Sequence, residues 1–275
     1  MKQQTLNRAF VVEGKGLHTG RWIRASFLPA DPDTGIRLSR VDLPGKPTCE
    51  ASARYVTATN RSTVLEHGTW RVSTVEHALS ALYAMGITNC LIELDGPEMP
   101  ILDGSAERFV EEIMKAGIQQ QAAEAKTWVV PETIRFDNGK GSVILITPAD
   151  DYEVKAVVDF PSTIVGRQEA EIKDLTTYPT EIAPARTFCF LKEILPLLFI
   201  GLIRGGRLNN ALVIGRHKFL SPLRFSNEPA RHKLLDVIGD LSLIGCRIKG
   251  HIYIERPGHG FNTMVAKSLI ERITQ

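Results

Sequence analysis

Two ionisable side chains four residues apart, His232 and Asp236, lie in a segment whose pattern is helical. Residues four apart on an α-helix lie one above the other on the same face, so this imidazole and this carboxylate could share one divalent metal ion. Taken alone, such a pair is more often a solvated ion pair, because short motif matches carry a high false-positive rate. Two further segments, residues 73–77 and 257–260, bring more groups of the same chemistry.

The first of these segments contains Glu76 next to His77. Consecutive helical residues point about 100° apart, so the two side chains would not easily bind one metal. A glutamate beside a ligating histidine can, however, reach the water that the metal activates. A structural alternative for Glu76 is the third position of a capping box, with Ser73 as the N-cap residue. The His-Glu-x-x-His motif, in which one helix supplies two ligands, is absent from the sequence.

His77, His232 and Asp236 together would supply three nitrogen and oxygen ligands. Three such ligands, with a fourth position left for water, suit a catalytic Zn²⁺, whereas a structural zinc site is normally closed by four protein ligands. Fe²⁺ fits the same ligands. The metal would lower the pKa of water towards about 7 and polarise a carbonyl group. Glu76 would then accept the proton of that water as a general base.

His259 lies between two glycines in a segment that we expect to be a loop. The commoner interpretation is a surface histidine; the functional one is an imidazolium that gives a proton or stabilises an oxyanion. Asp240, one helical turn beyond Asp236, either holds His259 in its charged form or faces solvent. The hydroxyl of Thr187 is a candidate donor to an oxyanion, and the alternative is an ordinary loop threonine.

The composition of the 275-residue chain is ordinary for a globular protein, with 43% hydrophobic and 23% charged residues. A net charge of +2 is too balanced for a nucleic-acid-binding surface, so we expect no nucleic-acid partner. The four cysteines form no Cys-x-x-Cys pair, which favours reduced thiols in an intracellular protein. Residues 1–10 lack the apolar core of a signal peptide, and we therefore expect a cytoplasmic protein.

The longest apolar run covers residues 194–203. A membrane span needs about 20 apolar residues, whereas this run is half that length and is interrupted by Pro196 and Gly201. We therefore expect no membrane span. The segment is either a buried core helix or an apolar groove for a ligand.

Two apolar-rich halves flank a polar segment, residues 117–126, which we expect to be a linker. Each half contains a Gly-Lys-Gly tripeptide, a strand-like segment, and later a helix-like segment followed by glycine and another strand, which indicates a weak repeat. His77 and His232 lie near the start of corresponding helices. If the halves pack face to face, these helix starts meet at an interface, where small-molecule sites are common. The expected strands are residues 22–27, 89–94, 142–147 and 251–255, and the expected helices are residues 75–85 and 231–244.

Six motifs occur in an order that is far more specific than any one of them. They are Gly-x-Gly-Leu-His-x-Gly at 14–20, Ser-Thr-Val-Glu-His at 73–77, Pro-Ile-Leu-Asp-Gly-Ser at 100–105, Ala-Arg-Thr-Phe at 185–188, Arg-His-Lys-Leu-Leu-Asp at 231–236 with Gly-Asp at 239–240, and Gly-His at 258–259. Together they cover nearly the whole chain, which closely resembles the UDP-3-O-acyl-N-acetylglucosamine deacetylase family.

The resemblance implies an α+β fold of two similar β-α-α-β domains, residues 1–122 and 127–275, whose sheets sandwich the helices and whose interface holds the active site. It implies a zinc-dependent amide hydrolase that removes the N-acetyl group of UDP-3-O-(3-hydroxyacyl)-N-acetylglucosamine, giving the free amine and acetate, early in lipid A biosynthesis. The implied site consists of the metal ligands His77, His232 and Asp236, the base Glu76, the second acid His259 with its partner Asp240, and the oxyanion donor Thr187.

The same resemblance implies the substrate contacts. An insert at about residues 190–215 would form a passage for the fatty acyl chain, in which each buried methylene contributes about 0.8 kcal/mol. One Zn²⁺ per chain and a monomeric state are expected. The implied contact residues are Phe188 in the pocket, Phe160, Lys233 and Arg256 at the uridine and diphosphate, and Ile194, Gly206, Ala211 and Val213 along the passage.

Two residues depart from the family pattern. Arg256 stands where lysine is common and would bind phosphate in a forked manner. Cys189 stands where glycine is frequent, which leaves the local shape of the pocket open.

Two other functions stay open as well. One is a zinc amidase with another amide substrate, and the apolar insert argues against a small hydrophilic one. The other is an inactive homologue that binds a lipid-linked sugar nucleotide, against which Glu76 and His259 argue, because a pure binder needs neither base nor acid.

Overall fold

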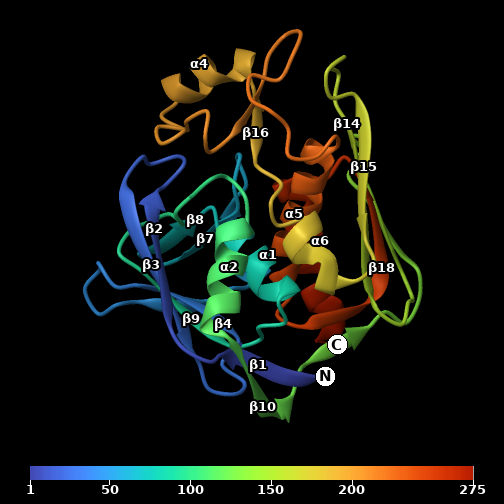
Figure 1. Cartoon of the computed structure of the whole chain (residues 1–275). Coiled ribbons are helices and arrows are strands. Elements are labelled where there is room, and N and C mark those ends of the chain that lie inside the picture. The colour runs from blue at the N-terminus through green and yellow to red at the C-terminus, as the bar shows by residue number, and fades with distance from the viewer. Residues whose placement is uncertain (275) are drawn as a thin grey trace.

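The chain has an α+β fold in which helices lie between two large sheets (Figure 1). The computed structural model describes residues 1–274. The first sheet comes from the first half of the chain, and buried and exposed side chains alternate along its strands, as expected when one face covers a core. Its strand order is β2 (Phe10–Lys15), β3 (Trp22–Pro29), β9 (Cys90–Leu94), β4 (Ile36–Arg40) and β5 (Thr48–Glu50).

The second sheet repeats the topology of the first. The central strand of each sheet is antiparallel to one neighbour and parallel to the other: β9 has this relation to β3 and β4. This is the repeat that the sequence indicates, and the four predicted strands are found as β3, β9, β13 and β18. The second order is β12 (Ile134–Asp137), β13 (Val143–Thr147), β18 (Arg247–Glu255), β14 (Tyr152–Asp159) and β15 (Arg167–Ile172), and β11 (Thr127–Val129) also pairs with β18.

Four helices fill the space between the sheets (Figure 1). Every residue of α1 is buried, which is typical of a helix that is enclosed on all sides. α2 instead buries one stripe that includes Phe109 and Ile113. The two predicted helices are α1 and α5, which pack directly against each other. The four helices are α1 (Glu76–Ala84), α2 (Glu107–Ala116), α5 (Glu228–Ser242) and α6 (His259–Ile273).

The segment predicted to be a linker, residues 117–126, contains a strand, so that prediction is wrong. β10 (Ile118–Glu124) pairs antiparallel with β1 (Lys2–Leu6). Asn89 Nδ2 joins both strands by donating to Gln3 Oε1 at 2.8 Å and to Gln121 Oε1 at 2.7 Å. Glutamines that resemble a solvated linker in the sequence therefore bond along a sheet edge. The domain limits, residues 1–122 and 127–275, stay a prediction.

The apolar run that begins at Ile194 is not a buried core helix, so that alternative is wrong. It forms α4 (Leu191–Phe199), which stands apart from the helices between the sheets and buries only Leu197 (Figure 1). Across residues 1–274, no helix is both long enough and apolar enough to cross a membrane. The remaining elements are a small sheet of β6 (Val56–Ala58), β7 (Val64–His67) and β8 (Trp70–Ser73), the parallel pair β16 (Phe188–Phe190) and β17 (Leu212–Ile214), α3 (Tyr178–Glu181), and the 3-10 helices η1 (Ala53–Tyr55) and η2 (Leu175–Thr177).

Candidate active site

The crossing of α1 and α5 brings ionisable residues from the two halves together. The first turn of α1 carries Glu76 and His77, and one face of α5 carries His232 and Asp236, which are four residues apart. The helices approach closely at Gly239, where a Cβ would lie 2.1 Å from the carbonyl oxygen of Glu76. Glycine is therefore required at this position for the crossing to form.

Glu76 does not act as a capping residue, so the capping-box alternative is wrong. α1 begins at Glu76 itself, and the preceding Val75 provides no side-chain cap. The hydroxyl of Ser73 donates to the carbonyl of Pro97 at 3.3 Å. The backbone N–H of Thr63 donates to Glu76 Oε2 at 3.0 Å. The turn between β6 and β7 thus holds the carboxylate.

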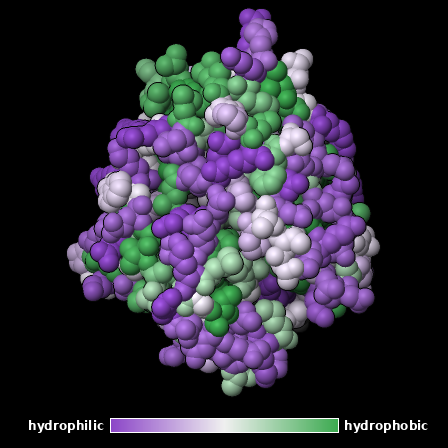
Figure 2. All heavy atoms as spheres, viewed as in Figure 1, coloured by the Kyte–Doolittle hydropathy of each residue, from purple (hydrophilic) through white to green (hydrophobic). Residues whose placement is uncertain are grey.

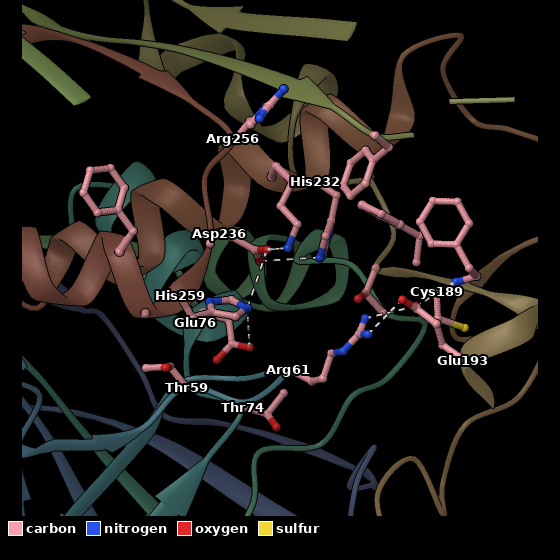
Figure 3. A pocket seen from close by; sticks show the side chains of 18 of the residues that line it. Thr59, Arg61, Thr74, Glu76, Cys189, Glu193, His232, Asp236, Arg256 and His259 are labelled. Atoms are coloured by element: carbon pink, nitrogen blue, oxygen red, sulfur yellow. Dashed lines mark hydrogen bonds and ion pairs between the residues drawn. The ribbon is translucent and has the colours of Figure 1, made fainter. Parts of the chain in front are cut away.

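His77, His232 and Asp236 form a compact buried cluster, with one ligand atom from each residue within 4.8 Å of the others. His232 Nδ1 lies 3.0 Å from the carbonyl of Ala185, which fixes Nδ1 as the protonated nitrogen of the neutral ring. The lone pair of its Nε2 then faces Asp236 Oδ1 at 3.4 Å, and His77 Nε2 lies 3.9 Å from the same oxygen. Figure 3 shows Asp236 and His232 pointing toward each other.

The cluster fits a cation. Asp236 Oδ1 is buried and has no hydrogen-bond partner among the described residues. A buried carboxylate oxygen without a partner is destabilising, and here electron-rich imidazole nitrogens stand near it. A divalent metal bound between these atoms would accept a lone pair from Asp236 Oδ1 and from each of the two imidazole nitrogens. Two histidines and one carboxylate are a normal ligand set for zinc with one open position.

The protonation states of the cluster also suit metal binding. Burial, reinforced by the nearby His232, lowers the pKa of His77 to about 3. Burial likewise lowers the pKa of His232. For Asp236, burial acts to raise the pKa, but Lys233 and the neighbouring imidazoles outweigh it and hold the pKa below its usual range. The two rings are thus neutral and the carboxylate is ionised, the forms that bind metals.

His259 is the first residue of α6, after the N-cap Gly258, so the predicted loop position is wrong. Its Nδ1 lies 2.9 Å from Asp240 Oδ2, and Asp240 is fully buried rather than facing solvent. The hydroxyl of Thr63 donates to Asp240 Oδ1 at 2.5 Å, and Asn262 Nδ2 donates to Oδ2 at 2.9 Å. Asp240 is thus held rigidly, and it orients the imidazole of His259.

Glu76 and His259 face each other beside the cluster (Figure 3), with 3.8 Å between Glu76 Oε1 and His259 Nε2. Burial, with help from the carboxylates of Asp240 and Asp236, raises the pKa of Glu76 to about 7. Burial acts to lower the pKa of His259, but Asp240, Asp236 and Glu76 together raise it to about 9. The site therefore holds one group suited to accept a proton and one suited to give a proton near neutral pH.

These groups line one cavity of about 530 Å³. Phe188 forms part of its wall, with its ring edge-on to Phe160 at 5.4 Å between centroids. Lys233 Nζ bonds to Asp236 Oδ2 at 2.8 Å, and Arg256 pairs with Asp159 at 2.7 Å. Of the residues predicted from the sequence, the cavity brings together Glu76, His77, Phe160, Thr187, Phe188, His232, Lys233, Asp236, Arg256 and His259.

Four predicted passage residues do not line this cavity. Ile194 is half-buried on α4, and Gly206 is exposed in the loop that follows. Ala211 and Val213 are buried at β17. The cavity nevertheless extends to the start of α4, because Lys192 and Glu193 are among its lining residues.

Sequence reasoning missed Arg61, whose guanidinium reaches across the cavity (Figure 3). Its Nη2 lies 3.0 Å from Glu193 Oε1, so the turn before β7 is tied to the first turn of α4. Arg61 has a φ of 67°, which is unusual for a residue with a side chain. No motif around Arg61 signals this contact, because its partner lies in a distant part of the sequence. Thr63 was missed for the same reason.

An α+β fold with a buried His–His–Asp cluster, a carboxylate of raised pKa and an oriented histidine in one cavity defines a metal-dependent hydrolase site. A family model described as LpxC, UDP-3-O-acyl N-acetylglycosamine deacetylase, matches residues 3–271. The chain therefore belongs to the LpxC family.

Curated relatives match nearly the whole length of the chain. It is 40% identical over 277 residues to UDP-3-O-acyl-N-acetylglucosamine deacetylase of Trichormus variabilis, covering 98% of this chain and 99% of that protein. The corresponding enzyme of Geobacter sp. (strain M21) is 39% identical, with 98% and 89% covered. The bifunctional enzyme LpxC/FabZ of Bacteroides thetaiotaomicron is 43% identical over 99% of this chain, but the chain spans only 65% of that relative.

Proposed function

We propose that this chain hydrolyses the N-acetyl group of UDP-3-O-(3-hydroxyacyl)-N-acetylglucosamine, giving acetate and the free amine, as a step of lipid A biosynthesis. The observation that carries the proposal is the convergence of Glu76, His259 and the cluster of His77, His232 and Asp236 in one cavity. Membership of the LpxC family and the names of the full-length relatives support this substrate.

In the proposed reaction, Glu76 accepts a proton from the attacking water, whose oxygen bonds to the acetyl carbon. The hydroxyl of Thr187 donates to the oxyanion that forms. The carbon–nitrogen bond then breaks, and the His259 imidazolium gives its proton to the leaving nitrogen. One water is consumed, acetate and the amine are released, and a proton passes from Glu76 to His259, which returns both groups to their starting states. Glu76 suits its role because a base is most effective when its pKa lies near the working pH, and burial raises its pKa to about 7.

We propose Zn²⁺ as the metal held by His77, His232 and Asp236, and Fe²⁺ fits the same donors. When bound, the metal lowers the pKa of water towards about 7 and polarises the acetyl carbonyl. Lys233 touches the ligand Asp236 and also lies 5.6 Å from the centre of the Phe188 ring, so it links the cluster to the cavity wall.

The substrate contacts are proposed from the shape of the cavity. Phe160, Phe188, Lys233 and Arg256 line it and supply aromatic surface and positive charge for the uridine and diphosphate. The acyl chain would leave the cavity toward α4, which contributes lining residues at its first turn. Beyond that point, Ile194, Gly206, Ala211 and Val213 are the proposed passage residues. A monomeric state and a cytoplasmic location stay predictions from the sequence.

The test is acetate release from the acylated UDP-sugar. We expect turnover by the wild type, and a loss of about 100- to 10,000-fold in the Glu76→Gln variant with its metal content unchanged. The His232→Ala variant should lose metal and turnover together. Glu181→Gln, which changes an exposed carboxylate on α3, is the matched control. Equal rates for the wild type and Glu76→Gln would contradict the mechanism, and no release by the wild type would contradict the substrate.

A further inference from the structure

Residues 191–220, which comprise α4, β17 and the loops around them, expose an unusual amount of apolar surface. Of the fourteen large hydrophobic side chains that are exposed in the described part of the chain, seven belong to this segment. Phe199 is 93% exposed, Leu195 is 76% exposed and Ile200 is 62% exposed. The full set is Leu191, Leu195, Leu198, Phe199, Ile200, Leu208 and Leu220.

These side chains gather in one place. Figure 2 shows a hydrophobic area at the top of the molecule, over the position of α4 in Figure 1. Contiguous exposed apolar patches on a protein surface mark sites of interaction with another protein, a ligand or a membrane. Within α4 only Leu197 is buried, so most of the apolar side chains of this helix contribute nothing to the core. We therefore expect another molecule to cover this patch.

The charge of the same segment indicates the chemistry of that occupant. Residues 191–220 contain five lysine and arginine side chains, all exposed, and one carboxylate, which gives a net charge of +4. The chain as a whole carries +2, so the remaining residues carry −2. The one carboxylate, Glu193, is paired with Arg61. The basic residues are Lys192, Arg204, Arg207, Arg216 and Lys218.

We propose that residues 191–220 are a membrane-docking surface that binds anionic phospholipid. The exposed side chains of α4 would insert among the acyl chains, and the basic side chains would lie at the headgroups. Leucine and phenylalanine beside lysine and arginine are the composition of segments that lie in a membrane interface. Each basic residue near an anionic leaflet adds attraction that salt screens. A helix of nine residues lies in the interface and does not span it.

The docking surface adjoins one end of the cavity. Lys192 and Glu193 belong to α4 and also line the cavity that holds the His–His–Asp cluster. A molecule docked through α4 therefore turns this end of the cavity toward the lipid. The docking itself depends only on residues 191–220 and not on the proposed deacetylation, so the two are tested separately.

The experiment is cosedimentation of the full chain with vesicles. We expect binding to vesicles of phosphatidylglycerol mixed with phosphatidylcholine, and binding at least about tenfold weaker to phosphatidylcholine alone. Raising the salt concentration should weaken the binding to the anionic vesicles. Leu195→Glu/Phe199→Glu should reduce it by about tenfold or more, and Arg207→Gln/Lys218→Gln should reduce it with a smaller dependence on salt. The matched control, Met114→Glu/Val129→Glu, changes two side chains that are also exposed, at 61% and 60%, but lie outside the segment, and it should bind as the wild type does.

Three results would overturn the proposal. The first is the absence of wild-type binding to anionic vesicles, and the second is equal binding by the Leu195→Glu/Phe199→Glu variant. The third is a wild-type dimer in sedimentation analysis that this variant dissociates, because the patch would then be covered by a second copy of the chain. Thermal unfolding shows whether the variants are folded. If the double variant is not, Phe199→Ser, which alters only the most exposed side chain of α4, replaces it.

Discussion

Glu76 and His259 are buried side by side, yet their surroundings displace their pKa values in directions that suit different tasks. Burial raises the pKa of the carboxyl to about 7, whereas nearby carboxylates raise the pKa of the imidazole to about 9 in spite of burial. Near neutral pH the first can accept a proton and the second carries one. Paired groups of this kind identify the base and the acid of an active site, although their titrations belong to the pair.

Asp240 is the positioning residue for His259, which gives a prediction at the residue scale. The Asp240→Asn change keeps the shape but removes the negative charge closest to the imidazole. The pKa of His259 should fall, and because the proposed reaction needs the protonated ring, the alkaline limb of the pH–rate profile should move to lower pH. We expect turnover to fall about 10- to 100-fold, with metal content unchanged. A profile that keeps its alkaline limb in place would show that Asp240 is merely structural.

At the element scale, the site depends on how closely α1 and α5 cross. The proposed base and one proposed ligand lie on α1, whereas two proposed ligands and Asp240 lie on α5, so a small shift between the helices separates them all. The contact is made backbone to backbone at Gly239, without space for a methyl group. Packed interiors respond to one added carbon because they have few voids.

Gly239→Ala should therefore damage both stability and activity. Its Cβ would lie 2.1 Å from the carbonyl oxygen of Glu76, so α5 must move away from α1. We expect a loss of about 1–3 kcal/mol in the free energy of unfolding and weaker metal binding, measured by urea denaturation and by metal titration. Gly258→Ala is the matched control, because a Cβ there meets no atom within 4 Å and its φ of −164° is open to any residue. If both variants retain wild-type metal affinity, the close crossing is not what positions the ligands.

The first turn of α5 contains a second residue on which the stability of this region depends, the fully buried Glu228. It accepts from Arg186 Nε at 2.8 Å and from the backbone N–H groups of Arg186 at 3.0 Å and Arg224 at 2.7 Å. Glu228→Gln would leave the Arg186 guanidinium buried without its counter-charge, which should reduce the free energy of unfolding by about 3–5 kcal/mol at pH 7. Denaturant unfolding measures the difference, and Glu181→Gln, on the surface, should stay within about 0.5 kcal/mol of the wild type.

The stabilisation by the Glu228–Arg186 pair should depend on pH. Burial acts to raise the pKa of Glu228, but its bonds to Arg186 and Arg224 outweigh burial and lower it. A carboxyl whose pKa is lower in the folded state stabilises that state above its unfolded pKa, about 4.3. This stabilisation disappears as the pH falls through the lower, folded value. The difference in the free energy of unfolding between the wild type and Glu228→Gln should thus become smaller only at acid pH. A difference that does not depend on pH would argue against an ionised Glu228.

The sequence predicts elements with strong local patterns better than it predicts where they lie. The helices over residues 75–85 and 231–244 and all four strands are found with small changes of bounds. The roles of Thr63 and Arg61 follow from contacts between distant segments, on which local spacing carries no information. Polar residues 117–126 become a strand because β1 offers a free edge. Of the two alternatives for the apolar run, the buried core helix is wrong, because apolar composition does not reveal which helices have already filled the core.

At the scale of the whole molecule, the two halves are joined at three levels. α1 of the first half packs on α5 of the second, the backbone N–H of Ile248 donates to the Tyr83 hydroxyl at 3.0 Å, and the backbone N–H of Ala53 donates to the carbonyl of Leu243 at 2.9 Å. The proposed metal adds a fourth link, because His77 comes from the first half and His232 and Asp236 come from the second. Binding to a site that exists only when both halves are folded stabilises both together.

Removal of the metal should therefore lower the thermal unfolding midpoint of both halves in parallel. A ligand present at 100 times its dissociation constant stabilises the folded state by about 2.7 kcal/mol, which corresponds to a few degrees, roughly 5–10 °C, in a chain of this size. Variants that keep only Trp70 or only Trp128 report on the first and second halves by fluorescence. We expect one coincident transition in each, shifted down equally by a chelator, and no chelator effect in His77→Ala. Separate transitions, or a shift seen at one tryptophan alone, would mean that the halves unfold independently and that the metal does not bridge them.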